Sequence, residues 1–331
     1  MKFNHCNFQN IKYEGMIIKS DRFLVLSLLF FVFTACEKSE LEETLTERVA
    51  TVDQAKAINL VFAETFESKV PFYTVHGTDF GTPYSFQVVS HPVFSGAKSA
   101  RFELRDTDPM ISSGTRSEVT IVKDAIQKEM WYSFAVFFPA DDFARDSGKE
   151  LISQWHQAAD SHLGEKSQSP ATHLVIKNDR FILDTGYNNE QISNGVIPAS
   201  RKRIDLGLVT KDTWHQFVIH FIHSYEADGL IEIWHNGNKI LTHPGGNMYN
   251  NVDMPRWKLG IYKWKWNGDE TTDTRKRVLY FDNIKVGDQQ VSLKDMAPDN
   301  NPPPIKDPTP HPITSLTFVN SHIDQDIKMI K

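Results

Sequence analysis

Polar residues of types that catalyse reactions fall at alternate positions within three short segments of this chain. The segments span residues 115–119, 153–156 and 257–262, and their polar members are Arg116, Glu118, Gln154, His156, Lys258 and Tyr262. Apolar residues such as Val119, Trp155 and Leu259 stand between or beside them. Because side chains alternate across a β-strand, each segment predicts a strand with a polar face and a face that turns toward a core.

An arginine, an amide, an imidazole and a phenol on one face suit the removal of a proton beside a carboxylate. In a uronic acid the C5 proton lies beside the carboxylate, and a glycosidic oxygen can leave from C4. Arg116 can hold the carboxylate in a bidentate fork, and Gln154 can donate to it without adding charge. Both favour the enolate-like transition state, in which negative charge moves onto the carboxylate.

His156 and Tyr262 are the candidates for moving the protons. An imidazole with an ordinary pKa of about 6.5 is a ready base at neutral pH. A phenol with an ordinary pKa of about 10 is a poor base but a competent acid. A cation beside it, such as Lys258, would lower the pKa of the phenol by favouring the phenolate.

Other residues are expected to support the site or to bind sugar. Glu118 is interpreted as the orienting partner of Arg116. Gly260 would leave room for a sugar ring, and Trp264 and Trp266 are expected to continue the polar face and to stack on neighbouring sugars.

The patterns R-S-E, Q-x-H and K-x-G-x-Y, in this order, resemble those of the jelly-roll alginate lyases. With tryptophan inside Q-W-H they also resemble heparin lyase I and fungal-type glucuronan lyase. The resemblance covers roughly residues 60 to 287. It implies that Arg116, Gln154 and His156 bind or neutralise the carboxylate and that His156 is the base for one epimer. It also implies that Tyr262 is the acid, or both base and acid, with Lys258 as a supporting cation.

The segments between these motifs predict an all-β fold. Strand-like runs occur at residues 60–67, 99–105, 131–139, 214–223, 230–241 and 277–286. Asn236-Gly237 stands between two such runs, which is a strong hairpin signal. Many short strands separated by turns predict an antiparallel β-sandwich, a concanavalin-like jelly roll with a concave groove for a polymer.

Composition limits the classes of function. The chain has 331 residues, of which 40% are hydrophobic, and a net charge of -6. This fits one large domain and argues against a nucleic-acid binder. Two basic triplets, at residues 201–203 and 275–277, predict either solvated loops or contacts with a sulfated polymer, for which Lys263 and Lys265 would also be suited.

No metal ion is expected in the chemistry. His215 and His223 share a face of their strand, whereas His220 points to the opposite face, so the three cannot converge on zinc. A structural calcium ion could brace the loops, although the sequence identifies no ligand set for it.

The N-terminus predicts export. A short apolar run from Phe23 to Ala35 precedes Cys36 and resembles a signal peptide with a bacterial lipobox, with Met16 as the expected true start. The acidic stretch that follows Cys36 resembles the tether of Bacteroidota lipoproteins. The expected organisation is a signal peptide over 1–36, a polar tether over 37–57, the β-domain over 58–290 and a proline-rich tail over 291–331.

The function predicted is an endo-acting polysaccharide lyase on a uronate-containing polymer, glucuronan- or ulvan-like. Heparin-like glycans and alginate are less favoured. The net charge of -6 argues against a groove adapted to heparin, and the bulky residues around Gly260 disfavour alginate. Two alternatives remain: a non-catalytic carbohydrate-binding lipoprotein, and a jelly-roll glycoside hydrolase, although no E-x-D-x-x-E strand is present. We expect a monomer at the outer membrane or cell surface, lipidated at Cys36, or a secreted form.

Overall fold

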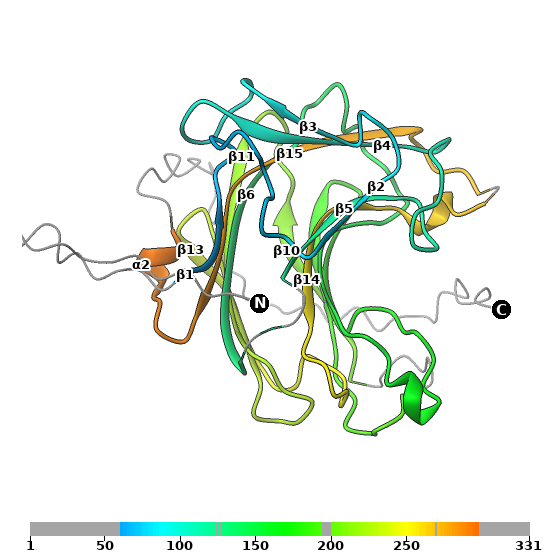
Figure 1. Ribbon diagram of the computed structural model, residues 1–331, viewed down its shortest axis with the longest axis vertical. Helices are drawn as coiled ribbons and strands as arrows, with labels where there is room; N and C mark the ends of the chain where they lie inside the picture. The colour runs from blue at the N-terminus through cyan, green and yellow to red at the C-terminus, as the bar shows by residue number, and fades with distance from the viewer. Residues whose placement is uncertain (1–59, 123–124, 126, 194–199, 269, 298–331) are drawn as a thin grey trace, which may run out of the picture. The chain divides into compact units, whose positions relative to one another are not determined.

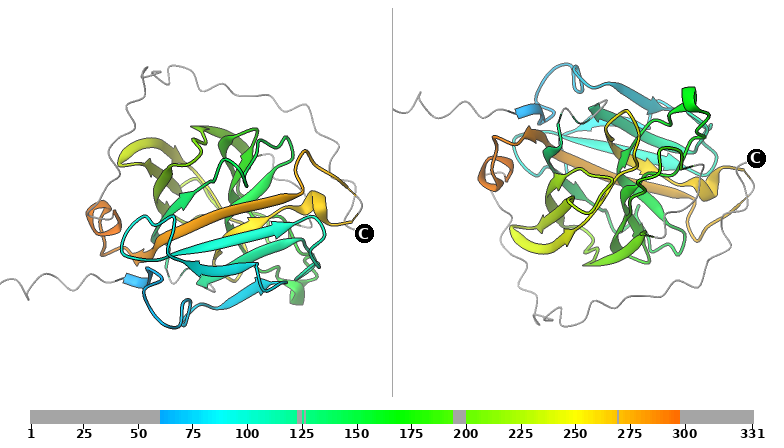
Figure 2. Two further views of the ribbon diagram at one scale, coloured as in Figure 1. Left: turned by 90° about the horizontal axis from the view of Figure 1, so that it is seen from above. Right: turned by 90° about the horizontal axis from the view of Figure 1, so that it is seen from below.

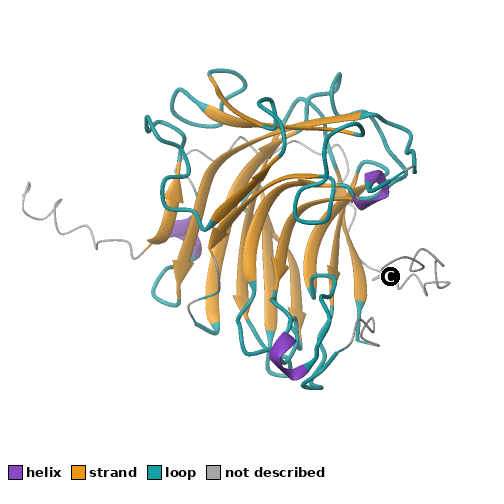
Figure 3. Ribbon diagram, turned by 45° about the vertical axis from the view of Figure 1, so that its right-hand side comes forward, coloured by secondary structure: helices purple, strands orange, loops and turns teal. Residues whose placement is uncertain are grey.

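The computed structural model describes residues 60–122, 125, 127–193, 200–268 and 270–297. Within them the chain forms two antiparallel β-sheets that pack face to face, with their loops at the ends of the strands (Figure 3). This confirms the predicted sandwich. The predicted signal peptide, Cys36, the tether and most of the C-terminal tail lie outside the described residues. Among the described residues, no helix is long and apolar enough to cross a membrane.

The first sheet, called the back sheet here, has eight strands. Its order is β13 (Asn238–Pro244), β12 (Leu230–His235), β11 (Trp214–Ile222), β6 (Glu129–Phe137), β15 (Lys276–Asp288), β4 (Ser99–Arg105) and β3 (Phe86–Val89), and β1 (Leu60–Glu64) also pairs with β15. The long strand β15, orange in Figure 2, lies between β6 and β4. The short helix α2 (Leu293–Met296) follows it.

The second sheet, called the site sheet here, has seven strands. Its order is β10 (Lys202–Leu208), β9 (Arg180–Thr185), β8 (Thr172–Lys177), β7 (Glu150–His156), β14 (Arg256–Tyr262), β5 (Arg116–Val122) and β2 (Gly77–Phe80). The three polar segments of the sequence are therefore β5, β7 and β14, with β14 in the middle. Figure 1 shows β5 and β14 in one layer and β6 and β11 in the other.

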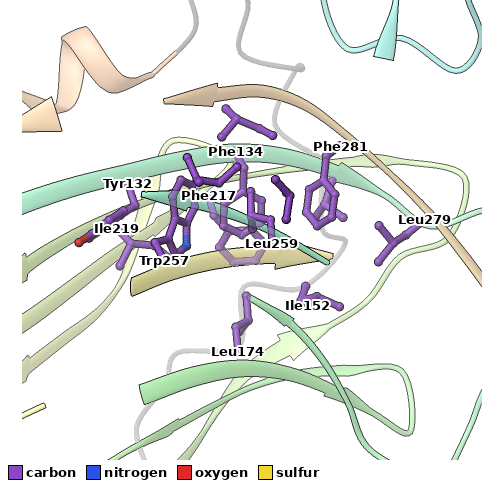
Figure 4. Packing of buried hydrophobic residues seen from close by; sticks show 14 of the residues in the cluster. Tyr132, Phe134, Ile152, Leu174, Phe217, Ile219, Trp257, Leu259, Leu279 and Phe281 are labelled. Atoms are coloured by element: carbon purple, nitrogen blue, oxygen red, sulfur yellow. The ribbon is translucent and has the colours of Figure 1, made fainter. Parts of the chain in front are cut away.

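The core fills the space between the two sheets (Figure 4). On β14 the residues Trp257, Leu259 and Ile261 have no exposed surface. The Trp257 ring lies 5.0 Å from that of Tyr132 on β6. A slip of one residue in the register of β14 would turn these side chains outward and bury the polar ones, so burial fixes which face Lys258 presents.

Two finer predictions about the back sheet are confirmed. Strand β12 ends at His235 and β13 begins at Asn238, and the turn residues Asn236 and Gly237 have φ values of 49° and 78°. Two positive φ values in succession are typical of a type I′ hairpin. On β11, His220 packs on the outer face, away from the core between the sheets.

Candidate active site

The site sheet brings the predicted polar residues of β5, β14 and β7 together. Pairs that lie directly opposite each other across the strands are Tyr262 with Arg116, Gly260 with Glu118, Lys258 with Gln154, and Arg256 with His156. Directly opposite residues of an antiparallel pair point to the same face. The polar side chains therefore share the outer face of the site sheet, on the side away from the core.

Glu118 is the centre of this group. Its side chain is buried, and one oxygen, Oε2, lies 3.0 Å from Arg116 Nη1. The other oxygen accepts a hydrogen bond from Gln154 Nε2. Burial raises the pKa of Glu118, although Arg116, Lys258 and Gln154 act in the opposite direction. The carboxylate thus fixes the orientation of the arginine and the amide together.

The guanidinium of Arg116 also packs over the ring of Tyr262, with its carbon 4.1 Å from the ring centroid. Gly114 makes this packing possible, because a Cβ at that position would lie 2.6 Å from both Arg116 Nη2 and Tyr262 Cε2. The Tyr262 side chain is half-buried, and its hydroxyl has no hydrogen-bond partner among the described residues. The phenol is therefore held by its ring while its oxygen can meet a ligand.

Lys258 pairs with a residue that sequence reasoning missed. Its Nζ lies 3.3 Å from Asp79 Oδ2 on β2, and Ser112 donates to the other oxygen of Asp79 at 2.7 Å. The ammonium group therefore contacts the β2 edge of the site. Asp79 stands alone in a short strand, and no local pattern marks it.

Gly260 has a structural role in addition to the one predicted from the sequence. Its φ is 142°, and a Cβ there would lie 2.1 Å from the carbonyl oxygen of Ser117 on the neighbouring strand β5. The glycine is therefore required for the close approach of β14 to β5. Space for a sugar ring beside Gly260 stays a prediction.

The imidazole of His156 is oriented by one contact. Its Nε2 lies 2.9 Å from the carbonyl oxygen of Gln168. A carbonyl oxygen only accepts, so Nε2–H donates and the neutral ring keeps its lone pair on Nδ1. Burial, with the nearby charges of Lys258 and Arg256, lowers the pKa of His156 to about 4. At neutral pH His156 is therefore an unprotonated imidazole with a defined tautomer.

Glu165 holds the loop that supplies this carbonyl. Its buried carboxylate accepts hydrogen bonds from the backbone N–H groups of Asp160 at 2.8 Å and Ser193 at 2.9 Å. It also accepts from the side chains of Gln168 and Asn251. The loop that includes η1 (Ser161–Leu163) and two other loops meet at this one side chain. Sequence reasoning missed Glu165 and Gln168, since neither belongs to a recognisable motif.

A family model described as polysaccharide lyase matches residues 54–285. The chain belongs to the polysaccharide lyase family. A search of curated protein sequences found no match. Among solved structures, the endo-β-1,4-glucuronan lyase of the fungus Trichoderma reesei is similar with a TM-score of 0.61 and 20% identity, over 73% of this chain and 99% of that one. The alginate lyase AlyC3 is similar with a TM-score of 0.42 and 14% identity, over 59% and 76%.

The two tryptophans that follow β14 separate in the lyase structure. After Tyr262 the chain turns into the 3₁₀ helix η2 (Trp264–Trp266), so the alternation of a strand no longer applies. The Trp264 ring is half-buried, 6.1 Å from that of Tyr262 and 5.2 Å from Lys149 Nζ. Trp266 is only 3% exposed and donates to Thr272 at 3.0 Å. The predicted placement of Trp266 on the sugar-binding face is wrong.

The basic residues suggested as sulfate contacts of the lyase differ in exposure. Lys263 and Arg277 have no exposed side-chain surface, and each pairs with one oxygen of Glu150, at 2.6 Å and 2.5 Å. Arg275 is 79% exposed, but it precedes β15 of the back sheet. The prediction that residues 275–277 read sulfate is therefore wrong for Arg277, and burial likewise removes Lys263.

The histidines of β11 have other partners than a metal. His215 Nδ1 lies 2.9 Å from His235 Nε2, and His220 lies 3.0 Å from both Glu129 and Glu232. Within the described part of the chain, no group of three or more His, Cys, Asp or Glu side chains could hold a metal ion. A calcium ion bound to the loops stays a prediction.

Proposed function

We propose that this lyase cleaves a uronate-containing polysaccharide by β-elimination and leaves 4,5-unsaturated uronate ends. The observation that carries the proposal is the arrangement around Glu118. It fixes Arg116 and Gln154 side by side, with the Tyr262 phenol against the guanidinium. A site with a carboxylate clamp next to a phenol suits a substrate that bears a carboxylate beside the bond to be broken.

In this proposal Arg116 and Gln154 bind the uronate carboxylate. The Arg116 side chain is 10% exposed, and Glu118 holds its guanidinium in place. Because the donors are already oriented, the growing negative charge of the enolate-like transition state meets fixed partners.

The elimination breaks the C5–H and C4–O4 bonds and forms a C4–C5 double bond. The base takes the C5 proton, and the electrons of that bond move through C4–C5 as the O4 leaving group departs with a proton from the acid. His156 Nδ1 is unprotonated and suits the base for one epimer. The Tyr262 hydroxyl suits the acid, or serves as both base and acid where the C5 proton lies on its own side.

The substrate we favour is a glucuronan- or ulvan-like polymer cut internally. The glucuronan lyase of Trichoderma reesei shares this fold over 99% of its chain. That shared fold is the reason for this preference. The breadth of the seven-stranded site sheet supports endo action, because a long polymer could cross it on both sides of the cleaved bond.

A panel of polyuronides tests the proposal. The purified lyase is incubated with glucuronan, ulvan, a heparin-like glycan and alginate, and products are followed by the ultraviolet absorbance of the unsaturated uronate and by reducing ends. We expect both signals to rise together on a glucuronate-containing polymer. Reducing ends without new absorbance would indicate a hydrolase, and neither signal on any polymer would indicate a binding protein.

A further inference from the structure

The other basic triplet, residues 201–203, lies on the same sheet as the candidate active site. Arg203 belongs to β10, the edge strand of the site sheet opposite to β2. The register places a continuous row of directly opposite residues across the sheet, namely Arg203, Asp184, His173, Gln154 and Lys258. Directly opposite residues share a face, so the row connects the triplet with the proposed carboxylate clamp.

At the Arg203 end of the row, an ion pair holds the guanidinium in one orientation. Arg203 Nε lies 2.8 Å from Asp184 Oδ1, and its Nη2 lies 3.1 Å from Oδ2, which is a bidentate pair. The Asp184 side chain is 3% exposed, whereas that of Arg203 is 43% exposed. Burial acts to raise the pKa of Asp184, but the contacts with His173 and Arg203 hold it well below its usual range. The carboxylate thus stays ionised and anchors a guanidinium that reaches the surface.

The distance along the row suits a polymer. Neighbouring strands lie about 4.8 Å apart, so the backbone of Arg203 is about 14 Å from that of Gln154, three strands away. This exceeds the width of one sugar ring. An anionic chain held by Gln154 and running across the strands would place a later sugar at Arg203.

We propose that Arg203, anchored by Asp184, is a second anion-binding subsite of this lyase. It would bind the carboxylate or the sulfate of a sugar several units from the cleaved bond. This inference rests on the proposed action on an anionic polysaccharide. In this proposal the 201–203 triplet contacts the polymer through Arg203. Arg277 and Lys263 cannot do so because they are buried.

Binding measurements on the full-length protein test the subsite. Affinities are measured for a long polyuronide and for a trisaccharide in the Tyr262→Phe background, with and without Arg203→Gln. We expect Arg203→Gln to weaken binding of the long polymer at least about fivefold and to reduce the preference for long over short chains. The matched control is Arg275→Gln, which removes an exposed arginine from the back sheet and should leave the preference unchanged.

The proposal would be overturned if the Arg203→Gln protein bound the long polymer as tightly as the parent protein does. It would also be overturned if Arg275→Gln lost as much affinity as Arg203→Gln. Arg203→Gln leaves Asp184 with one partner fewer, so the double variant Asp184→Asn/Arg203→Gln removes both charges and should show the same loss while it stays folded. A loss on sulfated and non-sulfated polymers alike identifies the carboxylate as the ligand. A loss on sulfated polymers alone identifies sulfate.

The two proposals fail separately. Absence of unsaturated product from the parent protein would reject the lyase chemistry, whereas the binding comparison needs no turnover and still decides the role of Arg203.

Discussion

Arg116 holds more of the site together than a single ion pair would. Its guanidinium contacts the Glu118 carboxylate, covers the Tyr262 ring and lies 3.4 Å from the carbonyl oxygen of Ser112. These contacts need a flat group with several donors. A lysine supplies one compact charge, which can satisfy one of the partners but cannot stack and fork at the same time.

Arg116→Lys should therefore lower kcat/KM by about tenfold or more, which is about 1.4 kcal/mol of lost transition-state stabilisation. Steady-state kinetics on the preferred polyuronide measure it. The matched control is Arg101→Lys on β4 of the back sheet, where Arg101 pairs with Glu103 at the same two-residue spacing. Parental kinetics in Arg116→Lys, or an equal loss in Arg101→Lys, would refute the role of Arg116 as the clamp.

The pH dependence of the reaction reports on His156. Its pKa is lowered to about 4, so the ring loses its basic form only when the pH falls through that value. An ordinary histidine would do so near pH 6.5. If His156 is the base, kcat/KM should stay constant from neutral pH to about pH 5 and should decrease at lower pH. The profile is measured where circular dichroism shows the native state. An acid limb centred near pH 6.5 would contradict the assignment.

At the level of elements, the alternation of side chains along β5 and β7 made part of the site predictable. Arg116 with Glu118 and Gln154 with His156 were placed by period alone, and the sheet then brought their strands together. The sequence could not predict Asp79, Gly114, Gln168 or Glu165, because these come from a separate strand and from loops whose course depends on tertiary contacts. The error at Trp266 has the same origin, since the change from a strand to a 3₁₀ turn after Tyr262 has no marker in the residues.

The loop anchored by Glu165 gives a prediction at this scale. Glu165→Ala leaves several buried donors without their acceptor, which should cost about 1–3 kcal/mol in the free energy of unfolding. It should also lower kcat, because the Gln168 carbonyl would no longer hold the His156 tautomer. Urea unfolding measures the change in the free energy of unfolding. The dependence of kcat on pH measures the effect on His156. Glu190→Ala removes an exposed carboxylate from one of the same loops and is the control. A stable variant with an unchanged pH profile would show that the loop does not position His156.

Within the described residues, three histidines on or next to the back sheet are buried or half-buried as neutral rings. Burial lowers the pKa of His215 to about 4 and the pKa values of His223 and His235 to about 3. In the unfolded chain each ring takes up a proton near pH 6.5. Between that value and the folded pKa the unfolded state binds more protons, so acidification favours unfolding.

The free energy of unfolding should therefore be at its full value above pH 6.5 and should fall between pH 6.5 and about 3. Each buried ring contributes up to about 1.4 kcal/mol per pH unit. Urea unfolding at a series of pH values measures this. His162→Gln removes an exposed ring and should leave the slope unchanged, whereas His223→Gln should reduce it. A flat stability curve across this window would show that the rings are not buried in neutral form.

In the proposed mechanism the Tyr262 hydroxyl moves a proton during elimination. Tyr262→Phe removes that oxygen and keeps the ring that Arg116 covers, so the protein should fold and bind polymer. The release of unsaturated uronate by this variant is the most direct measurement, with Tyr280→Phe on the back sheet as its control. General acid–base groups contribute about two to four orders of magnitude, so kcat should fall at least about a hundredfold, on the order of 2.7 kcal/mol. A folded Tyr262→Phe protein that releases unsaturated product at nearly the parental rate would contradict the mechanism.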